Sequence, residues 1–84
     1  MKLGEKMLKV LSKLYEPSRL VEVTIGRYDL AFKTDESGRP VLLFIGHKGE
    51  DGKIIRERFA RRIVTNKEGK ITRDHWDNKG RSSN

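Results

Sequence analysis

The chain has 84 residues and a mass of 9.7 kDa, with 35% hydrophobic and 37% charged residues, which is enough for one domain with a modest core. It has no cysteine, which excludes disulfides, thiolate zinc sites, iron–sulfur clusters and a cysteine nucleophile. The formal net charge is +7, and residues 41–84 hold eleven basic against six acidic residues. A positive field of this kind favours an anionic partner but says nothing about the fold.

Membrane and export segments are not indicated. The longest apolar run, residues 41–45, is far shorter than the roughly 20 residues of a membrane-spanning helix. Charged residues at helical spacing interrupt the opening segment, unlike the apolar stretch of a secretory signal. We therefore expect no membrane contact and a cytoplasmic location.

The first predicted element is an amphipathic helix over about residues 3–16. Its apolar residues recur every three or four positions: Leu3, Met7, Val10, Leu11 and Leu14. Pro17 is expected to end the helix, because proline has no N–H to donate and disfavours helical geometry in the residue before it.

Residues 20–34 alternate between apolar and polar with a change of phase. One parity holds Val21, Val23 and Ile25, and the other holds Tyr28, Leu30 and Phe32. The change falls at Gly26 and Arg27, where a bulge would reverse the facing of the side chains. The pattern predicts a kinked strand, or two short ones, with apolar side chains on both faces.

Three more strands follow. Residues 41–48 are apolar at both parities, which is typical of a central strand. Residues 53–65 alternate, and residues 70–76 form a short last strand. The turns at residues 36–39, 50–53 and 67–70 each place glycine before a basic residue, which predicts type I turns with a G1 bulge, and residues 78–81 look like a fourth copy without a following strand.

These elements predict an α+β fold: an N-terminal amphipathic helix packed on a bent four-stranded antiparallel meander. Apolar residues at both parities would leave a hydrophobic patch in water, so a partly closed barrel, a folded-over tail or a second molecule is expected to cover it. The domain is predicted over residues 1–77, followed by a disordered basic tail at 78–84.

The densest motif is a run of five basic residues and one acidic residue between Lys53 and Arg62. Alternation would place Arg56, Arg58 and Arg62 on one side, where each guanidinium group can bind two phosphate oxygens. The predicted nucleic-acid-binding residues are Lys53, Arg56, Arg58, Arg62, Lys70 and Arg73. The alternative is a solvated face in which Glu57, Asp74 or Glu22 neutralises the arginines.

Other motifs are weaker. His47 and His75 lie without metal-ligand spacing, and the segment Asp74–Asp77 lacks an activated nucleophile, so we predict no metal, no cofactor and no enzymatic activity. Tyr28 and Trp76 are the rings that could stack on bases, with core packing as the alternative.

The sequence therefore predicts a small, basic, non-enzymatic binding module that contacts a nucleic-acid backbone through an Arg-rich strand without strong sequence preference. The alternative is a protein-interaction or homo-oligomerisation domain, a homodimer or a complex with a protein partner, that uses a second apolar sheet face.

Overall fold

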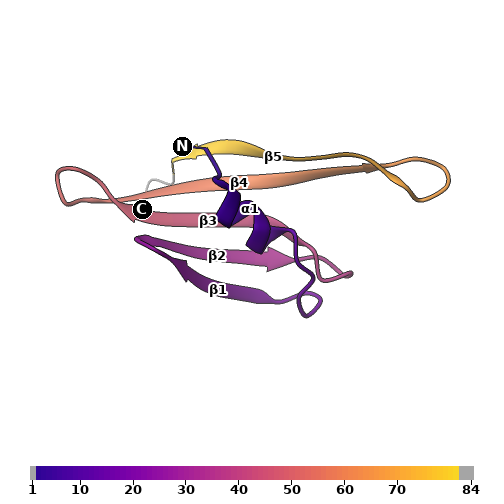
Figure 1. Ribbon diagram of the computed structural model, residues 1–84, viewed down its shortest axis with the longest axis horizontal. Coiled ribbons are helices and arrows are strands. Elements are labelled where there is room, and N and C mark those ends of the chain that lie inside the picture. The colour runs from indigo at the N-terminus through magenta and orange to yellow at the C-terminus, as the bar shows by residue number, and fades with distance from the viewer. Residues whose placement is uncertain (1, 82–84) are drawn as a thin grey trace.

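The computed structural model describes residues 2–81, which form one short helix and an open, five-stranded antiparallel sheet (Figure 1). The elements are α1 (Glu5–Leu11), β1 (Leu20–Ile25), β2 (Tyr28–Thr34), β3 (Pro40–Lys48), β4 (Ile54–Thr65) and β5 (Ile71–Arg81). Each strand pairs with the next one in the chain, so β1 and β5 are the two edges of a meander that does not close into a barrel. The molecule measures 49 × 23 × 22 Å.

The phase change at Gly26 is a hairpin turn rather than a bulge. Gly26, with a φ of 59°, and Arg27 connect β1 to β2, and Val23 pairs with Leu30 across the hairpin. Because paired residues of antiparallel strands point to the same face, the apolar residues of both strands lie together. The alternative of two short strands is confirmed, which gives the sheet five strands instead of four, and the expectation of opposing apolar faces in this segment is wrong.

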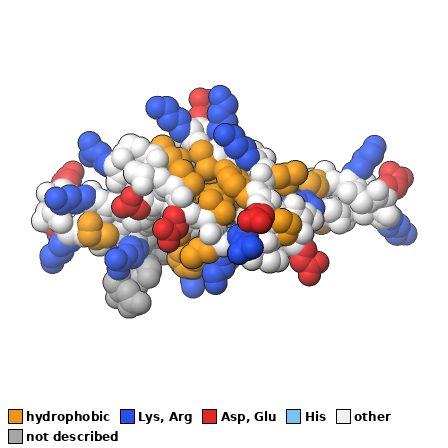
Figure 2. All heavy atoms as spheres, turned by 90° about the horizontal axis from the view of Figure 1, so that it is seen from below, with side chains coloured by type: hydrophobic (Ala, Val, Ile, Leu, Met, Phe, Trp, Pro, Cys, Tyr) orange, Lys and Arg blue, Asp and Glu red, His pale blue; other side chains and the backbone are white. Residues whose placement is uncertain are grey.

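The core lies between α1 and one face of the sheet, which we call the helix face; the other is the open face. The buried core residues are Met7, Leu11, Leu30, Phe32, Leu43, Ile45 and Phe59. Seen from the β1 edge, hydrophobic side chains gather at the middle of the molecule, and charged side chains lie around them and at both ends (Figure 2). The open face also carries apolar residues, among them Leu42, Phe44 and Ile54, which confirms the expectation that strand β3 is apolar on both faces.

The helix is shorter than predicted and does not end at Pro17. It ends at Leu11, where Ser12 Oγ donates a hydrogen bond to the Leu8 carbonyl at 2.6 Å. The following segment bonds to the β2–β3 turn instead, because Tyr15 N donates to the Gly38 carbonyl at 2.8 Å. Tertiary hydrogen bonds therefore override the helical periodicity. Within residues 2–81, no helix is long and apolar enough to cross a membrane.

The predicted glycine turns are confirmed. Gly38, Gly52 and Gly69 have φ values of 85°, 82° and 81°, and each donates its N–H to the carbonyl three residues earlier. Gly80, with a φ of 92°, lies within β5, where the register with β4 shifts. Residues 78–81, expected in the tail, therefore belong to the strand, and residues 82–84 lie outside the described residues.

Candidate nucleic-acid interface

Strand β4 presents a row of arginines on the open face. Its side chains alternate, so that Phe59 is buried in the core while Arg58 and Arg62 are exposed on the opposite side. On β5, Arg73 pairs with Val64 and shares the same face. We call Arg58, Arg62 and Arg73 the basic row.

The basic row keeps its positive charge. Each of its three arginines is exposed, and none forms an ion pair with a carboxylate within residues 2–81. The carboxylates expected to neutralise the arginines lie elsewhere: Glu57 is buried on the helix face, 3.7 Å from His47, and Glu22 is on β1, three strands away. The guanidinium groups are thus exposed to anions in solution.

Arg56 lies on the same side of β4 but in different surroundings. It borders a hollow of about 790 Å³ on the open face, whose lining includes Glu22, Asp29 and Lys48. Glycine at position 46, the partner of Arg56 on β3, contributes no side chain there. Because acidic and basic groups line this hollow together, we do not include Arg56 in the basic row.

The two predicted lysines lie at opposite ends of β4. Lys70 is in the β4–β5 turn beside Lys67, where its N–H donates to Asn66 Oδ1 at 3.0 Å. Lys53 is in the β3–β4 turn at the other end of the molecule, where its N–H donates to Asp51 Oδ1 at 3.1 Å (Figure 1). Of the six predicted residues, Arg58, Arg62 and Arg73 share the open face of β4 and β5, and Arg56 borders the hollow on that face. Lys70 lies at one end of β4 and Lys53 at the other.

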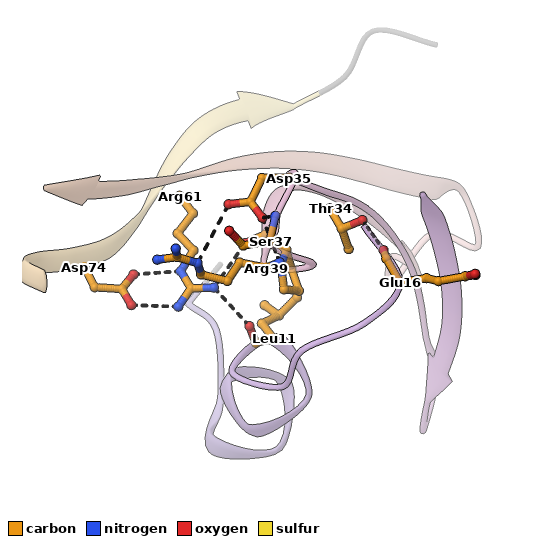
Figure 3. A network of polar contacts seen from close by, with 9 residues as sticks. Leu11, Glu16, Thr34, Asp35, Ser37, Arg39, Arg61 and Asp74 are labelled. Atoms are coloured by element: carbon orange, nitrogen blue, oxygen red, sulfur yellow. Dashed lines mark hydrogen bonds and ion pairs between the residues drawn. The ribbon is translucent and has the colours of Figure 1, made fainter. Parts of the chain in front are cut away.

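Arg61 belongs to the helix face and has a structural role (Figure 3). Its side chain is only 10% exposed, and Nε and Nη2 donate to the two carboxylate oxygens of Asp74 at 2.7 and 2.6 Å. Its Nη1 donates to the carbonyls of Leu11 and Pro40 at 3.2 and 3.1 Å. Arg61 therefore joins the end of α1, the start of β3 and β5.

Hydrogen bonding within this pair shifts the ionisation of both groups. The hydrogen bond to Asp74 raises the pKa of Arg61 above its usual value, and the hydrogen bond from Arg61 lowers the pKa of the Asp74 carboxyl. Both shifts favour the charged forms. The sequence offers a signal for this role, since Arg61 shares the parity of Phe59 and Ile63, which predict the buried face.

His75 and Asp77 also lie on the open face, beside the basic row. They pair across the sheet with Arg62 and Ala60, and His75 Nε2 is 3.2 Å from Asp77 Oδ1. Asp74 forms an ion pair with Arg61 on the helix face, so Asp77 is the carboxylate of this segment that lies against His75. No group of three or more histidines or carboxylates among residues 2–81 could hold a metal ion.

The two rings considered for base stacking are turned toward the core. Trp76 lies under Arg61, whose guanidinium carbon is 5.8 Å from the ring centroid, and the Tyr28 ring centroid is 5.4 Å from that of His47. Phe44, paired with Arg58, is 37% exposed on the open face. Neither of the two rings considered lies on the open face, where Phe44 is exposed beside Arg58.

Beyond Ala60, strand β4 pairs only with β5. Pairing with β3 ends at Leu42 and Ala60, whereas pairing with β5 continues to Thr65 and Ile71. Residues 62–73, which we call the arm, extend beyond the other strands as a two-stranded ribbon and form the narrow projection at the right of Figures 1 and 2. The arm carries four basic residues and one acidic residue: Arg62, Lys67, Lys70, Arg73 and Glu68.

Comparisons with protein families, with curated proteins and with solved structures find no match for this chain.

Proposed function

We propose that the protein is a non-enzymatic module that binds the phosphate backbone of nucleic acid without strong sequence preference. The observation that carries this proposal is the basic row, which is exposed on one face and has no ion pair within the described residues. Guanidinium groups match the geometry of phosphate oxygens, and the net charge of +7 attracts polyanions from a distance.

The placement of the acidic residues supports the same function. Asp74 neutralises Arg61, and Glu57 lies on the helix face, so these two carboxylates do not screen the open side of β4. Asp77 is the acidic neighbour of the basic row on β5. The face thus keeps an excess of positive charge close to Arg62 and the arm.

The experiment measures binding of a labelled, mixed-sequence duplex by fluorescence anisotropy as salt is increased. About four phosphate contacts would give a slope of roughly −3.6 for log K against log salt concentration. In the double variant Arg58→Ala and Arg62→Ala, the slope should become shallower by about two and binding should weaken at least about tenfold at low salt.

The control is the double variant Lys6→Ala and Lys13→Ala, which removes the same charge from exposed positions at and after α1. It should leave the slope close to that of the original protein. Equal weakening in both double variants would show that net charge alone matters, and no binding at low salt would overturn the proposal.

A protein-interaction role is the second candidate, because apolar side chains are exposed on the open face, among them Val64 at 39%. Leu20, Phe44 and Ile54 are 56%, 37% and 59% exposed. Apolar association persists when salt screens charge, so a dimer that survives high salt in sedimentation experiments would favour this role. A monomer at high protein concentration would count against self-association.

A further inference from the structure

Resting on the proposed function, we infer that the arm enters the major groove of a DNA duplex, so that double-stranded DNA is the preferred ligand. The first observation is that residues 62–73 have no third strand beside them. A ribbon of two strands, unlike a full sheet, can enter a groove with both of its faces accessible.

The dimensions of the arm fit this groove. Its two strands lie about 4.8 Å apart and, with side chains, the ribbon is on the order of 10 Å across. The major groove of B-DNA is about 12 Å wide and 8.5 Å deep, whereas the minor groove, at about 6 Å, is too narrow. Four residues at the end of β4 span about 13 Å, which exceeds the depth of the major groove. The deep, narrow major groove of duplex RNA does not admit such a ribbon.

The charges of the arm are arranged along its length. Arg62 and Arg73 lie at its base on the open face, and Lys67 and Lys70 lie at its tip. The tip is held in shape, because Asn66 Oδ1 accepts the N–H groups of residues 68 and 70, each at 3.0 Å. A turn fixed before binding loses less conformational entropy when it meets the phosphates that border a groove.

The uncharged residues of the arm also favour a duplex over a single strand. Residues 62–73 contain no aromatic residue, although proteins that bind single strands use ring stacking on successive bases. The arm instead exposes Val64 and Ile71, at 39% and 48%. Apolar side chains of this kind can contact the thymine methyl group, which lies in the major groove.

The test compares three ligands by anisotropy at one salt concentration: a short plain duplex, the same duplex with bulky groups on thymine C5, and a single strand of equal length. C5 substituents fill the major groove and leave the backbone unchanged. We expect the plain duplex to bind about tenfold more tightly than either of the others, which corresponds to about 1.4 kcal/mol.

The arm itself is tested with Lys67→Ala and Lys70→Ala, which should weaken binding of the plain duplex and have little effect on the modified one. Lys6→Ala and Lys13→Ala is again the charge-matched control. Equal binding of plain and modified duplexes, or of duplex and single strand, would overturn the inference. The proposed function would survive that result if Arg58→Ala and Arg62→Ala still reduced the salt dependence, whereas absence of all binding at low salt would overturn both.

Discussion

Adjacent arginines on β4 differ in almost every physical respect. Arg61 is 10% exposed and makes four hydrogen bonds that join three elements, whereas Arg62 is exposed on the other face beside His75. The difference arises from the strand period of two residues, which directs neighbours to opposite faces. A count of basic residues in a strand therefore overstates its anion-binding charge, because one parity can be used for packing and hydrogen bonding.

The largest expected effect tests the difference between Arg61 and Arg62 directly. Arg61→Ala should lower the free energy of unfolding by about 3 kcal/mol, because it leaves Asp74 without its ion-pair partner and removes two bonds to carbonyls. Arg62→Ala should change it by less than about 0.5 kcal/mol. Urea denaturation of the two variants measures both values, and similar losses would contradict the division between the faces.

Two glycine turns allow a second comparison. Gly38 lies against the segment after α1, and Gly69 lies in the turn at the tip of the arm. Gly38 and Gly69 have nearly the same positive φ, but a Cβ at Gly38 would collide with the carbonyl oxygen of Tyr15, whereas one at Gly69 would meet nothing within 4 Å. Gly69→Ala should cost about 1 kcal/mol, from backbone strain alone. Gly38→Ala should cost about 2–3 kcal/mol, because the collision adds to that strain. Thermal and urea unfolding of the two variants measures both losses of stability. Equal losses would contradict the prediction.

The ionisation of Asp74 makes the contribution of the Arg61–Asp74 pair to stability depend on pH. Because the pKa of Asp74 is lowered in the folded protein, the pair contributes stability above the unfolded carboxyl pKa of about 3.9, and this stability is lost as pH falls through the folded value. Asp74→Asn should be less stable at neutral pH and should lose less stability than the original protein below pH about 4. Urea midpoints measured across this range test the prediction, and parallel pH profiles would contradict it.

The smallest expected effect concerns the open face. Asp77 is the acidic residue next to the basic row, and its side chain is 41% exposed. Asp77→Asn should strengthen duplex binding by roughly twofold to fivefold at low salt, since charge interactions at exposed sites are weak and screened. Asp29→Asn, on β2 of the same face, is the charge-matched control, and equal strengthening would show that only net charge changed.

Local patterns predicted much of the sheet. The strands, the turns at Gly38, Gly52 and Gly69, and the parity of β4 all follow from alternation and turn chemistry, which depend on residues close in sequence. At Gly26 the sequence fits either a bulge or a hairpin, because a two-residue turn and a bulge both change the phase of the alternation. Pairing between strands, which the sequence does not specify, distinguishes the two.

Long-range contacts account for the other differences. The helix stops at Leu11 because the chain beyond it bonds to the β2–β3 turn, and β5 continues to Arg81 by pairing with β4. The bidentate contact of Arg61 with Asp74 joins residues 13 positions apart. Alternation indicates that Arg61 lies on the buried side of β4, but it does not identify Asp74 as its ion-pair partner. For the candidate site, parity placed Arg58 and Arg62 together, whereas the projection of the arm depends on where β3 begins.

The positive φ of Gly80 has a consequence for self-assembly. Strand β5 is a long sheet edge, and a straight, uncharged edge of this kind is a template on which other chains can add strands and grow fibres. The irregular register near Gly80 interrupts the ladder, and ionisable side chains occupy most of the strand between Arg73 and Arg81. The ionisable side chains of β5, acidic and basic alike, thus protect this border of the sheet against aggregation.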